Sequence, residues 1–181
     1  MAIIVVGGSG RGVGKTALVC GLIAALPEFA WTAVKITSHA HGTPDAIWEE
    51  TGPTEQGTDT ARYLAAGARR AVLVRAPEET FPFRRIQDAL KLEPHVIFES
   101  NRIVNHLKPD VCLGVLGGRS AEVKDSFAAF LGRTDALVAP VDADLTGLAP
   151  GIPLFRWAAV GIMPPAMLGW VRARLSGPRP S

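Results

Sequence analysis

Short runs of apolar, often β-branched residues recur along the chain, and more polar stretches separate them. The runs cover residues 2–7, 31–37, 71–76, 95–100, 111–118 and 135–141. They lack the alternation of apolar and polar positions that a strand with one face in water shows. Strands that are buried on both faces have this continuous apolar character, as in parallel sheets. The pattern therefore predicts a set of parallel strands.

Helical patterns occupy the stretches between these runs. The predicted helices cover residues 15–26, 59–66, 83–92, 101–107 and 121–131. An alternation of strands and helices at this spacing is typical of α/β proteins, in which helices cover both faces of a parallel sheet. We therefore expect a three-layer, doubly wound α/β domain with a mostly parallel sheet over residues 1–150.

Two segments do not follow this alternation. Residues 38–57 form a polar insertion after the second apolar run, and loops of this length are usually functional or mobile. Residues 151–181 form a hydrophobic tail, of which 152–171 approach the length of a membrane span. Arg156 and three prolines interrupt that stretch, so it does not predict a spanning helix. We expect the tail to dock on the core or on a partner, with a peripheral membrane contact as the alternative.

Composition and charge narrow the function classes. The 181 residues carry a formal net charge of +2 and no block of like charges, so we expect no nucleic-acid partner. The two cysteines, Cys20 and Cys112, lie far apart in apolar surroundings and show no zinc-binding spacing. They are typical of buried thiols in a reducing compartment. The first apolar run has no basic region before it and is short, so it predicts a strand rather than a signal peptide. We expect a cytoplasmic protein.

The strongest chemical signal is the stretch "GGSGRGVGKTAL" at residues 7–18, directly behind the first apolar run. A strand, a glycine-rich turn, Lys-Thr and a helix form the arrangement of the P-loop NTPases. Glycines let backbone N–H groups surround an anion, and the helix presents its positive end to it. Lys15 can reach the β- and γ-phosphates, and Thr16 can place its hydroxyl on Mg²⁺. The sequence therefore predicts a nucleotide-binding phosphate loop.

The loop departs from the strict pattern at Ser9, where that pattern has glycine. Its spacing also resembles the loop of the MinD-like, or SIMIBI, branch of P-loop proteins, in which a second lysine precedes the glycines. Gly10 stands at that lysine's position here, and Arg11 follows it. Arg11 could act as a charge clamp in cis or in trans, or remain solvated.

Two carboxylates are candidates for the metal side of the site. Glu99 ends the apolar run 95–100, where a carboxylate is costly unless it faces a site, although Glu99 and Ser100 could instead cap a helix. Asn101 could cap that helix or contact a ligand. Asp59 lies in the first turn of a predicted helix that Thr58 or Thr60 could cap, one turn before Arg62. We expect Thr16, Glu99 and Asp59 to coordinate Mg²⁺, with Glu99 and Lys15 as the catalytic residues.

These segments together resemble a known family. The stretches "VKITSHAHGTPD", "GTDTARYLAAGARRAVLV" and "VIFESN" are similar to motifs of the molybdopterin-guanine dinucleotide biosynthesis protein B (MobB) family. The resemblance covers roughly residues 1–118, although Ser100 stands where the family has glycine. It implies a GTP-binding accessory protein, usually dimeric, that assists the attachment of GMP to molybdopterin.

The sequence determines neither the base of the nucleotide nor the ligand of the two histidines in the polar insertion. Asp142 or Asp144, at the end of the last apolar run, could accept hydrogen bonds from guanine, or else lie in a solvated turn. Guanine therefore follows from the resemblance alone, and adenine stays an alternative. His39 and His41 could share an anion or a substrate, and a third ligand for a metal is not evident.

The nucleotide contacts that we expect lie in the phosphate loop, in the first turn of the helix that follows it, and at one residue directly after the last predicted strand. They are Gly10, Arg11, Gly12, Val13, Gly14, Lys15, Thr16, Ala17 and Asp142. The favoured function is a slow or partner-stimulated GTPase in molybdenum cofactor biosynthesis, with Mg²⁺ as cofactor, a biosynthetic protein as partner and a homodimeric state. An ATP-dependent small-molecule kinase and a non-catalytic, nucleotide-gated binding module are the alternatives.

Overall fold

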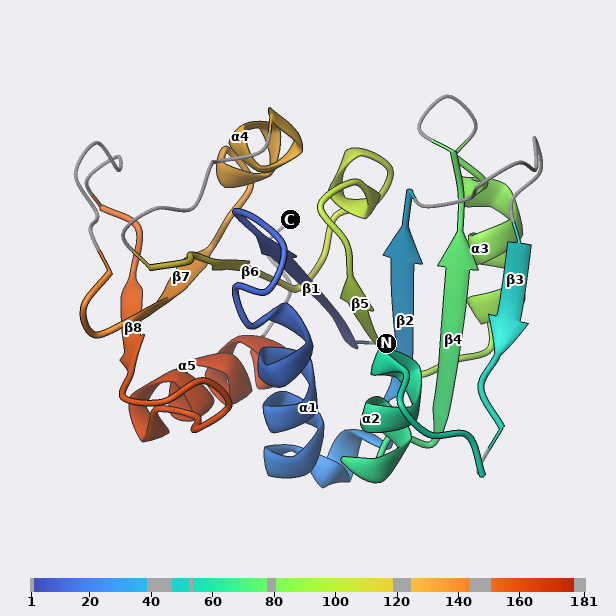
Figure 1. Cartoon of the computed structure of the whole chain (residues 1–181), viewed down its shortest axis with the longest axis horizontal. Coiled ribbons are helices and arrows are strands. Elements are labelled where there is room, and N and C mark those ends of the chain that lie inside the picture. Colours follow the sequence, from blue (N-terminus) through green and yellow to red (C-terminus); the bar gives the residue numbers. More distant parts are fainter. Residues whose placement is uncertain are drawn as a thin grey trace.

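The sheet confirms the predicted α/β fold class. The computed structural model describes residues 2–38, 47–52, 54–77, 81–118, 125–143 and 151–177. Its strands are β1 (Ala2–Gly8), β2 (Thr32–Thr37), β3 (Ile47–Glu50), β4 (Arg70–Arg75), β5 (His95–Glu99), β6 (Val111–Val115), β7 (Ala136–Pro140) and β8 (Leu154–Trp157). They form one sheet of eight strands in the order β3-β4-β2-β5-β1-β6-β7-β8 (Figure 1). Every neighbouring pair is parallel except β3 with β4.

Helices cover both faces of this sheet, as a doubly wound fold requires. They are α1 (Lys15–Ala25), α2 (Asp59–Ala65), α3 (Phe83–Leu90), α4 (Asp125–Leu131) and α5 (Pro165–Ser176), with short 3₁₀ turns η1 (Pro27–Phe29) and η2 (Ile103–Asn105). On one face α5, α1 and α2 follow one another (Figure 1) and bury side chains such as Leu18, Tyr63 and Met167 in one core. On the other face α3, α4 and η2 bury Ile86 and Phe127 in a second core.

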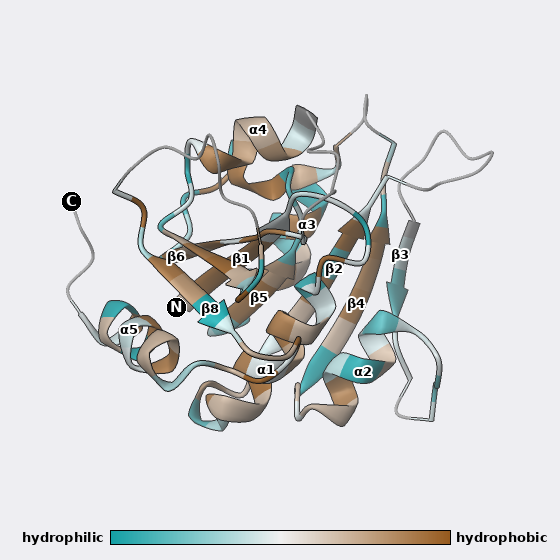
Figure 2. Ribbon diagram, turned by 60° about the vertical axis from the view of Figure 1, so that its left-hand side comes forward, coloured by the Kyte–Doolittle hydropathy of each residue, from teal (hydrophilic) through white to brown (hydrophobic). Residues whose placement is uncertain are grey.

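The predicted strands are those in the middle of the sheet. Of these strands, β1, β2, β5 and most of β4 are coloured as hydrophobic in Figure 2, whereas hydrophilic residues colour the edge strand β3. Residues 38–57, predicted to be a polar insertion outside the alternation of strands and helices, contain the strand β3. Glu49 pairs with Arg75 at 2.9 Å and Glu50 with Arg70 at 2.9 Å, so two ion pairs join the side chains of β3 to those of β4. An exposed edge strand of this kind has no apolar pattern to reveal it.

The prediction of a helix at residues 101–107 was wrong, because the chain makes only the single turn η2 there. The Ser100 hydroxyl accepts hydrogen bonds from the N–H groups of Arg102 at 3.1 Å and Ile103 at 3.3 Å. The chain then reaches β6 within a few residues. Hydrogen bonds of this kind start a helical turn, so Ser100 favours the start of η2, which does not continue into a longer helix.

The C-terminal segment completes the sheet and one helical layer. β8 pairs in parallel with β7, and α5 packs on the same face as α1. Trp157 of β8 is 1% exposed, and Met167 and Val171 of α5 are fully buried. The boundary that we placed at residue 150 stays a prediction. In the part of the chain that the structure describes, no helix is both long and apolar enough to cross a bilayer.

Candidate functional site

The glycine-rich stretch forms a loop between β1 and α1 at the carboxyl edge of the sheet. Gly14 is the last residue before α1 and has φ +105°, a conformation that side-chain-bearing residues rarely adopt. A Cβ atom at this position would lie 2.9 Å from the ring of Trp157. Among the described residues no side chain caps the N-terminus of α1, and its first turn has no acidic residue. The turn thus presents backbone N–H groups and the positive end of a helix to an anion.

Ser9 has a structural role that explains the departure from the strict motif. It is 2% exposed, and its hydroxyl accepts a hydrogen bond of 3.1 Å from the N–H of Gly117 after β6. Its own N–H donates to the carbonyl of Val115 at 2.9 Å. The serine therefore joins the phosphate loop to the neighbouring strand.

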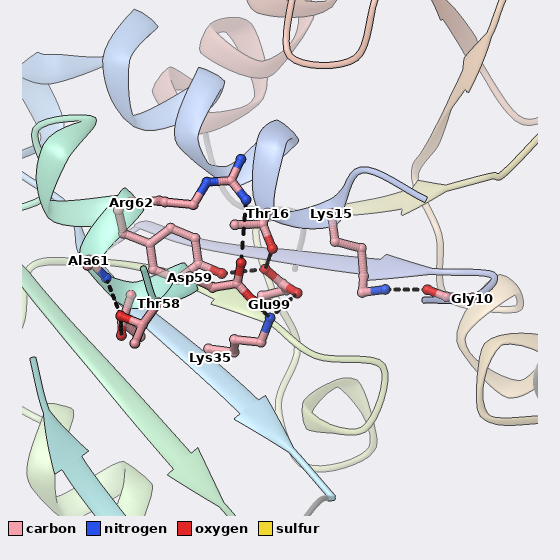
Figure 3. Close-up of polar contacts among 11 residues, drawn as sticks. Gly10, Lys15, Thr16, Lys35, Thr58, Asp59, Ala61, Arg62 and Glu99 are labelled. Carbon is pink, nitrogen blue, oxygen red and sulfur yellow. Dashed lines mark hydrogen bonds and ion pairs between the residues drawn. The ribbon is translucent and has the colours of Figure 1, made fainter. Parts of the chain in front are cut away.

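A pocket of about 660 Å³ opens beside the loop. Lys15 and Thr16 of α1 and Lys35 of β2 line it, with Asp59 of α2 and Glu99 of β5. The Lys15 ammonium donates to the carbonyl of Gly10 at 2.6 Å, so the lysine folds back over its own loop (Figure 3). The volume lies in the range of ordinary small-molecule sites.

Glu99 is the centre of a hydrogen-bonded cluster in this pocket (Figure 3). Its side chain is 4% exposed. The Thr16 hydroxyl donates to Glu99 Oε2 at 2.8 Å, and the Tyr63 hydroxyl donates to the same oxygen. The Lys35 ammonium donates to Glu99 Oε1 at 3.0 Å. Three donors from three different elements therefore hold this buried carboxylate, as a buried charge requires.

Asp59 extends the cluster toward the opening of the pocket. Its Oδ2 pairs with Lys35, and its Oδ1 lies 3.5 Å from the Arg62 guanidinium. Burial alone would raise the pKa of Asp59, but the hydrogen bond and charge of Lys35 outweigh it and lower the pKa below its usual value of 3.8. Asp59 is therefore an anion at neutral pH.

Lys35 and Tyr63 both keep their protons at neutral pH. Burial opposes the charge of Lys35, yet the negative charge of Glu99 and the contact with Asp59 raise the pKa of the lysine. Burial and the neighbouring Glu99 raise the pKa of the Tyr63 hydroxyl well above 10. Lys35 is thus a cation and Tyr63 a neutral donor at neutral pH.

The structure brings most of the sequence-predicted residues together. Those that line the pocket are Gly10, Arg11, Gly12, Gly14, Lys15, Thr16, Ala17, Asp59 and Glu99. Val13 is 8% exposed and belongs to the core, and Asp142 is exposed outside the set of residues that line this pocket. His39, His41 and Asp144 lie outside the described residues.

Two open alternatives have an answer in the structure. Thr58 is the cap of α2, since its hydroxyl accepts from the N–H of Ala61 at 3.0 Å. Asn101 does not cap a long helix, because its side chain binds the backbone of Gly8 in the phosphate loop; it also lines the pocket, and its contact with a ligand stays a prediction.

Sequence reasoning gave no role to Lys35 or Tyr63. Lys35 is a charged residue inside an apolar strand, which is itself a signal because such a charge needs a partner. Tyr63 follows Asp59 by one helical turn, and residues four apart lie on the same helical face. That spacing is the signal that could have found the tyrosine.

Comparison with solved structures shows which proteins share this architecture. The MobB protein of Bacillus subtilis superposes with a TM-score of 0.51 at 19% identity, covering 98% of this chain and 100% of that one. The MobB homolog of Bacillus stearothermophilus gives a TM-score of 0.50 at 14% identity, over 97% and 98% of the two chains. LpxK of Aquifex aeolicus, in an apo form in complex with ATP, gives 0.54 at 18% identity over 86% of this chain. The chain has the fold of MobB and LpxK.

The match to MobB extends over nearly the whole of both chains, whereas this chain spans about half of LpxK, at 53% of its length. No protein-family model matches the sequence, and no curated protein matches it. The resemblance to MobB is therefore confirmed at the level of the fold. It extends beyond residues 1–118, because the superposition includes the C-terminal segment with β8 and α5.

Proposed function

We propose that this protein binds a nucleoside triphosphate with Mg²⁺ in the pocket beside the phosphate loop and hydrolyses it slowly. The observation that carries the proposal is the 2.8 Å hydrogen bond from Thr16, the residue after Lys15, to the buried Glu99. It joins the loop that would hold phosphate to a carboxylate on a neighbouring strand, which is the arrangement that a metal-bound nucleotide needs.

The residues of the cluster suit a hard divalent cation. Mg²⁺ prefers oxygen ligands, and Thr16, Glu99 and Asp59 offer a hydroxyl and two carboxylates that line one pocket. In this proposal these three residues hold the metal, directly or through water. When bound, Mg²⁺ neutralises the charge that develops on the phosphates.

The protein's own groups do the rest by position and charge. Lys15 turns from the Gly10 carbonyl to the phosphate oxygens, and the backbone N–H groups of the loop donate to the same anion. Asp59 is engaged by Lys35 and Arg62, and Glu99 by three donors. Neither carboxylate is placed as a free general base, which favours slow or partner-stimulated hydrolysis.

For the base and the biological role we propose GTP and the assembly of a guanine-containing molybdenum cofactor. The motifs around Lys35, Asp59 and Glu99 support this, together with the shared fold of the MobB proteins. A homodimer that works with a second biosynthetic protein in the cytoplasm belongs to the same proposal. Asp142 remains the candidate for the guanine contact.

LpxK favours a second candidate, because that protein was crystallised in complex with ATP and shares this fold. The alternative is an ATP-dependent kinase for a small molecule. Arg62, whose side chain is 56% exposed at the rim of the pocket, would contact the acceptor. ADP production that depends on an added acceptor would distinguish this function from slow hydrolysis.

Thermal unfolding tests the proposal directly. The melt is measured with Mg²⁺ and GTP, with Mg²⁺ and ATP, and with Mg²⁺ alone, for the wild type, Lys15→Ala and the exposed control Lys91→Ala. A ligand at 100 times its Kd adds about 2.7 kcal/mol of stability. For a chain of this size the midpoint should rise by roughly several degrees.

Three outcomes of the melt distinguish the proposals. A shift with GTP alone that survives in Lys91→Ala and disappears in Lys15→Ala supports the GTP-binding proposal. A shift with ATP alone favours the kinase. If neither nucleotide shifts the wild type, the proposed nucleotide site is wrong.

A further inference from the structure

Lys35 lies where nucleotide binding alone does not require a lysine. It belongs to β2, and in the register of the sheet it is the direct partner of Glu99 on β5. Its ammonium contacts Glu99 Oε1 at 3.0 Å and also pairs with Asp59 Oδ2, so it joins two carboxylates from different elements (Figure 3). The lysine is thus the shared counter-ion of the two proposed metal ligands.

We propose that Lys35 is a built-in cation that prevents Asp59 and Glu99 from binding a divalent metal until nucleotide phosphates enter the pocket. The inference rests on the proposed function of the same site and adds its order of loading. The metal then arrives with the nucleotide, not before it.

The charges in the cluster give the reason. The two carboxylates carry two negative charges, and Lys35 contacts one oxygen of each. The other oxygen of Glu99 already accepts from Thr16 and Tyr63, so the lysine contacts the oxygen that these donors leave. A divalent cation at the same oxygens would meet an ammonium at close range. Like charges repel strongly where little water screens them, and Glu99 is only 4% exposed.

Nucleotide phosphates change this balance. Lys35 lines the same pocket as the phosphate loop, so phosphates there would offer its ammonium a new anionic partner. The carboxylate oxygens would then be released to a metal that the phosphates also attract. Without phosphates, moving the lysine leaves its charge without an equivalent partner.

Arg62 provides an internal comparison. It also faces Asp59, but at 3.5 Å, from a side chain that is 56% exposed, and it is joined to a single carboxylate in the cluster. Water therefore screens its charge more than that of Lys35, whose side chain is 21% exposed. Removal of Arg62 should leave the metal blocked.

The test is binding of Mn²⁺ alone, measured by the electron paramagnetic resonance signal of the free ion in the absence of nucleotide. The wild type should bind Mn²⁺ weakly, and Lys35→Met should bind it with a Kd lower by at least about tenfold. Lys35→Arg keeps the charge, and Arg62→Met keeps the lysine, so both should behave as the wild type. The double variant Lys35→Met/Glu99→Gln should lose the gained binding.

One result overturns the inference: a folded Lys35→Met that binds Mn²⁺ no more tightly than the wild type does. Circular dichroism decides whether the variant folds. If Lys35→Met is unfolded without metal, Mn²⁺ should restore its fold by replacing the lost charge, and failure to do so also overturns the inference.

A titration of the wild type with a fluorescent nucleotide and Mg²⁺ separates this inference from the proposed function. If the wild type binds nucleotide and Lys35→Met gains no Mn²⁺ binding, the role of Lys35 fails alone. If the wild type binds no nucleotide while Lys35→Met gains Mn²⁺ binding, the proposed function fails and the blocking role of the lysine stands.

Discussion

Asn101 holds both backbone polar groups of Gly8. Its Oδ1 accepts from the Gly8 N–H at 2.8 Å, and its Nδ2 donates to the Gly8 carbonyl at 3.1 Å. The same Nδ2 lies 3.2 Å from the hydroxyl of Ser126 in α4. The loop after β5 therefore fixes the first turn of the phosphate loop, although the two are more than ninety residues apart in the chain.

We expect Asn101→Ala to weaken nucleotide binding through this contact. The substitution leaves two backbone groups of Gly8 without their partner, at a cost of about 1–3 kcal/mol. If the loop then loses its bound shape, the Kd for nucleotide should rise about tenfold, which corresponds to 1.4 kcal/mol. Titration with a fluorescent nucleotide measures it. Asn105→Ala changes an exposed asparagine of η2 and should bind as the wild type. Equal affinity in all three proteins would show that the contact does not shape the loop.

Ser9 gives a prediction that runs against the consensus of the motif. Ser9→Ala removes the acceptor of the Gly117 N–H, and we expect a loss of about 1 kcal/mol in the free energy of unfolding. Ser9→Gly matches the strict pattern but loses the same bond and gains backbone freedom, so it should lose about 0.5–1 kcal/mol more. Urea denaturation measures both variants, with the exposed Ser176→Ala as control. A Ser9→Gly protein as stable as the wild type would contradict this role.

The sequence revealed the parts of the fold that have local patterns. The inner strands are apolar throughout because both of their faces are covered, and the phosphate loop is recognised by the spacing of Gly14, Lys15 and Thr16. β3 and β8 were missed, because short edge strands such as "IWEE" and "LFRW" mix polar and apolar residues without a period.

The candidate site could be predicted only in part for a related reason. Thr16 and Glu99 were identified singly by the chemistry of their positions. The contact of Lys35 with Glu99 depends on β2 and β5 being neighbours in the sheet. Local sequence patterns do not predict the order of the strands. Tyr63 reaches Glu99 only because α2 packs over the same face as α1.

His95 should make the stability of the protein depend on pH. Its ring packs edge-on against Phe29 and Trp31, and burial lowers the pKa of its imidazole below 6.5. The unfolded chain then binds a proton more readily than the folded one, so stability falls as the pH drops through the unfolded pKa. Between about pH 7.5 and about pH 5.5 the wild type should lose stability in urea, and His95→Phe should lose less. Identical losses in both proteins would contradict this assignment.

Gly14 and Gly57 separate two costs of adding a side chain. Both have positive φ, at +105° and +78°, so alanine strains the backbone of either, at about 1–2 kcal/mol. A Cβ at Gly57 meets no atom within 4 Å among the described residues, whereas at Gly14 it would lie 2.9 Å from the Trp157 ring and 3.0 Å from Val160. Trp157 is buried in the core and has little room to move.

Gly14→Ala should therefore destabilise the protein by about 1–3 kcal/mol more than Gly57→Ala, the usual cost of overpacking a core. Urea denaturation of the two variants gives the difference. Gly14→Ala should also abolish the nucleotide-dependent rise in melting temperature, because the strained residue directly precedes the helix that faces the phosphates, while Gly57→Ala keeps it. Equal losses of stability would mean that Trp157 of β8 moves to make room for the added methyl group. In that case the C-terminal segment does not hold the phosphate loop in place.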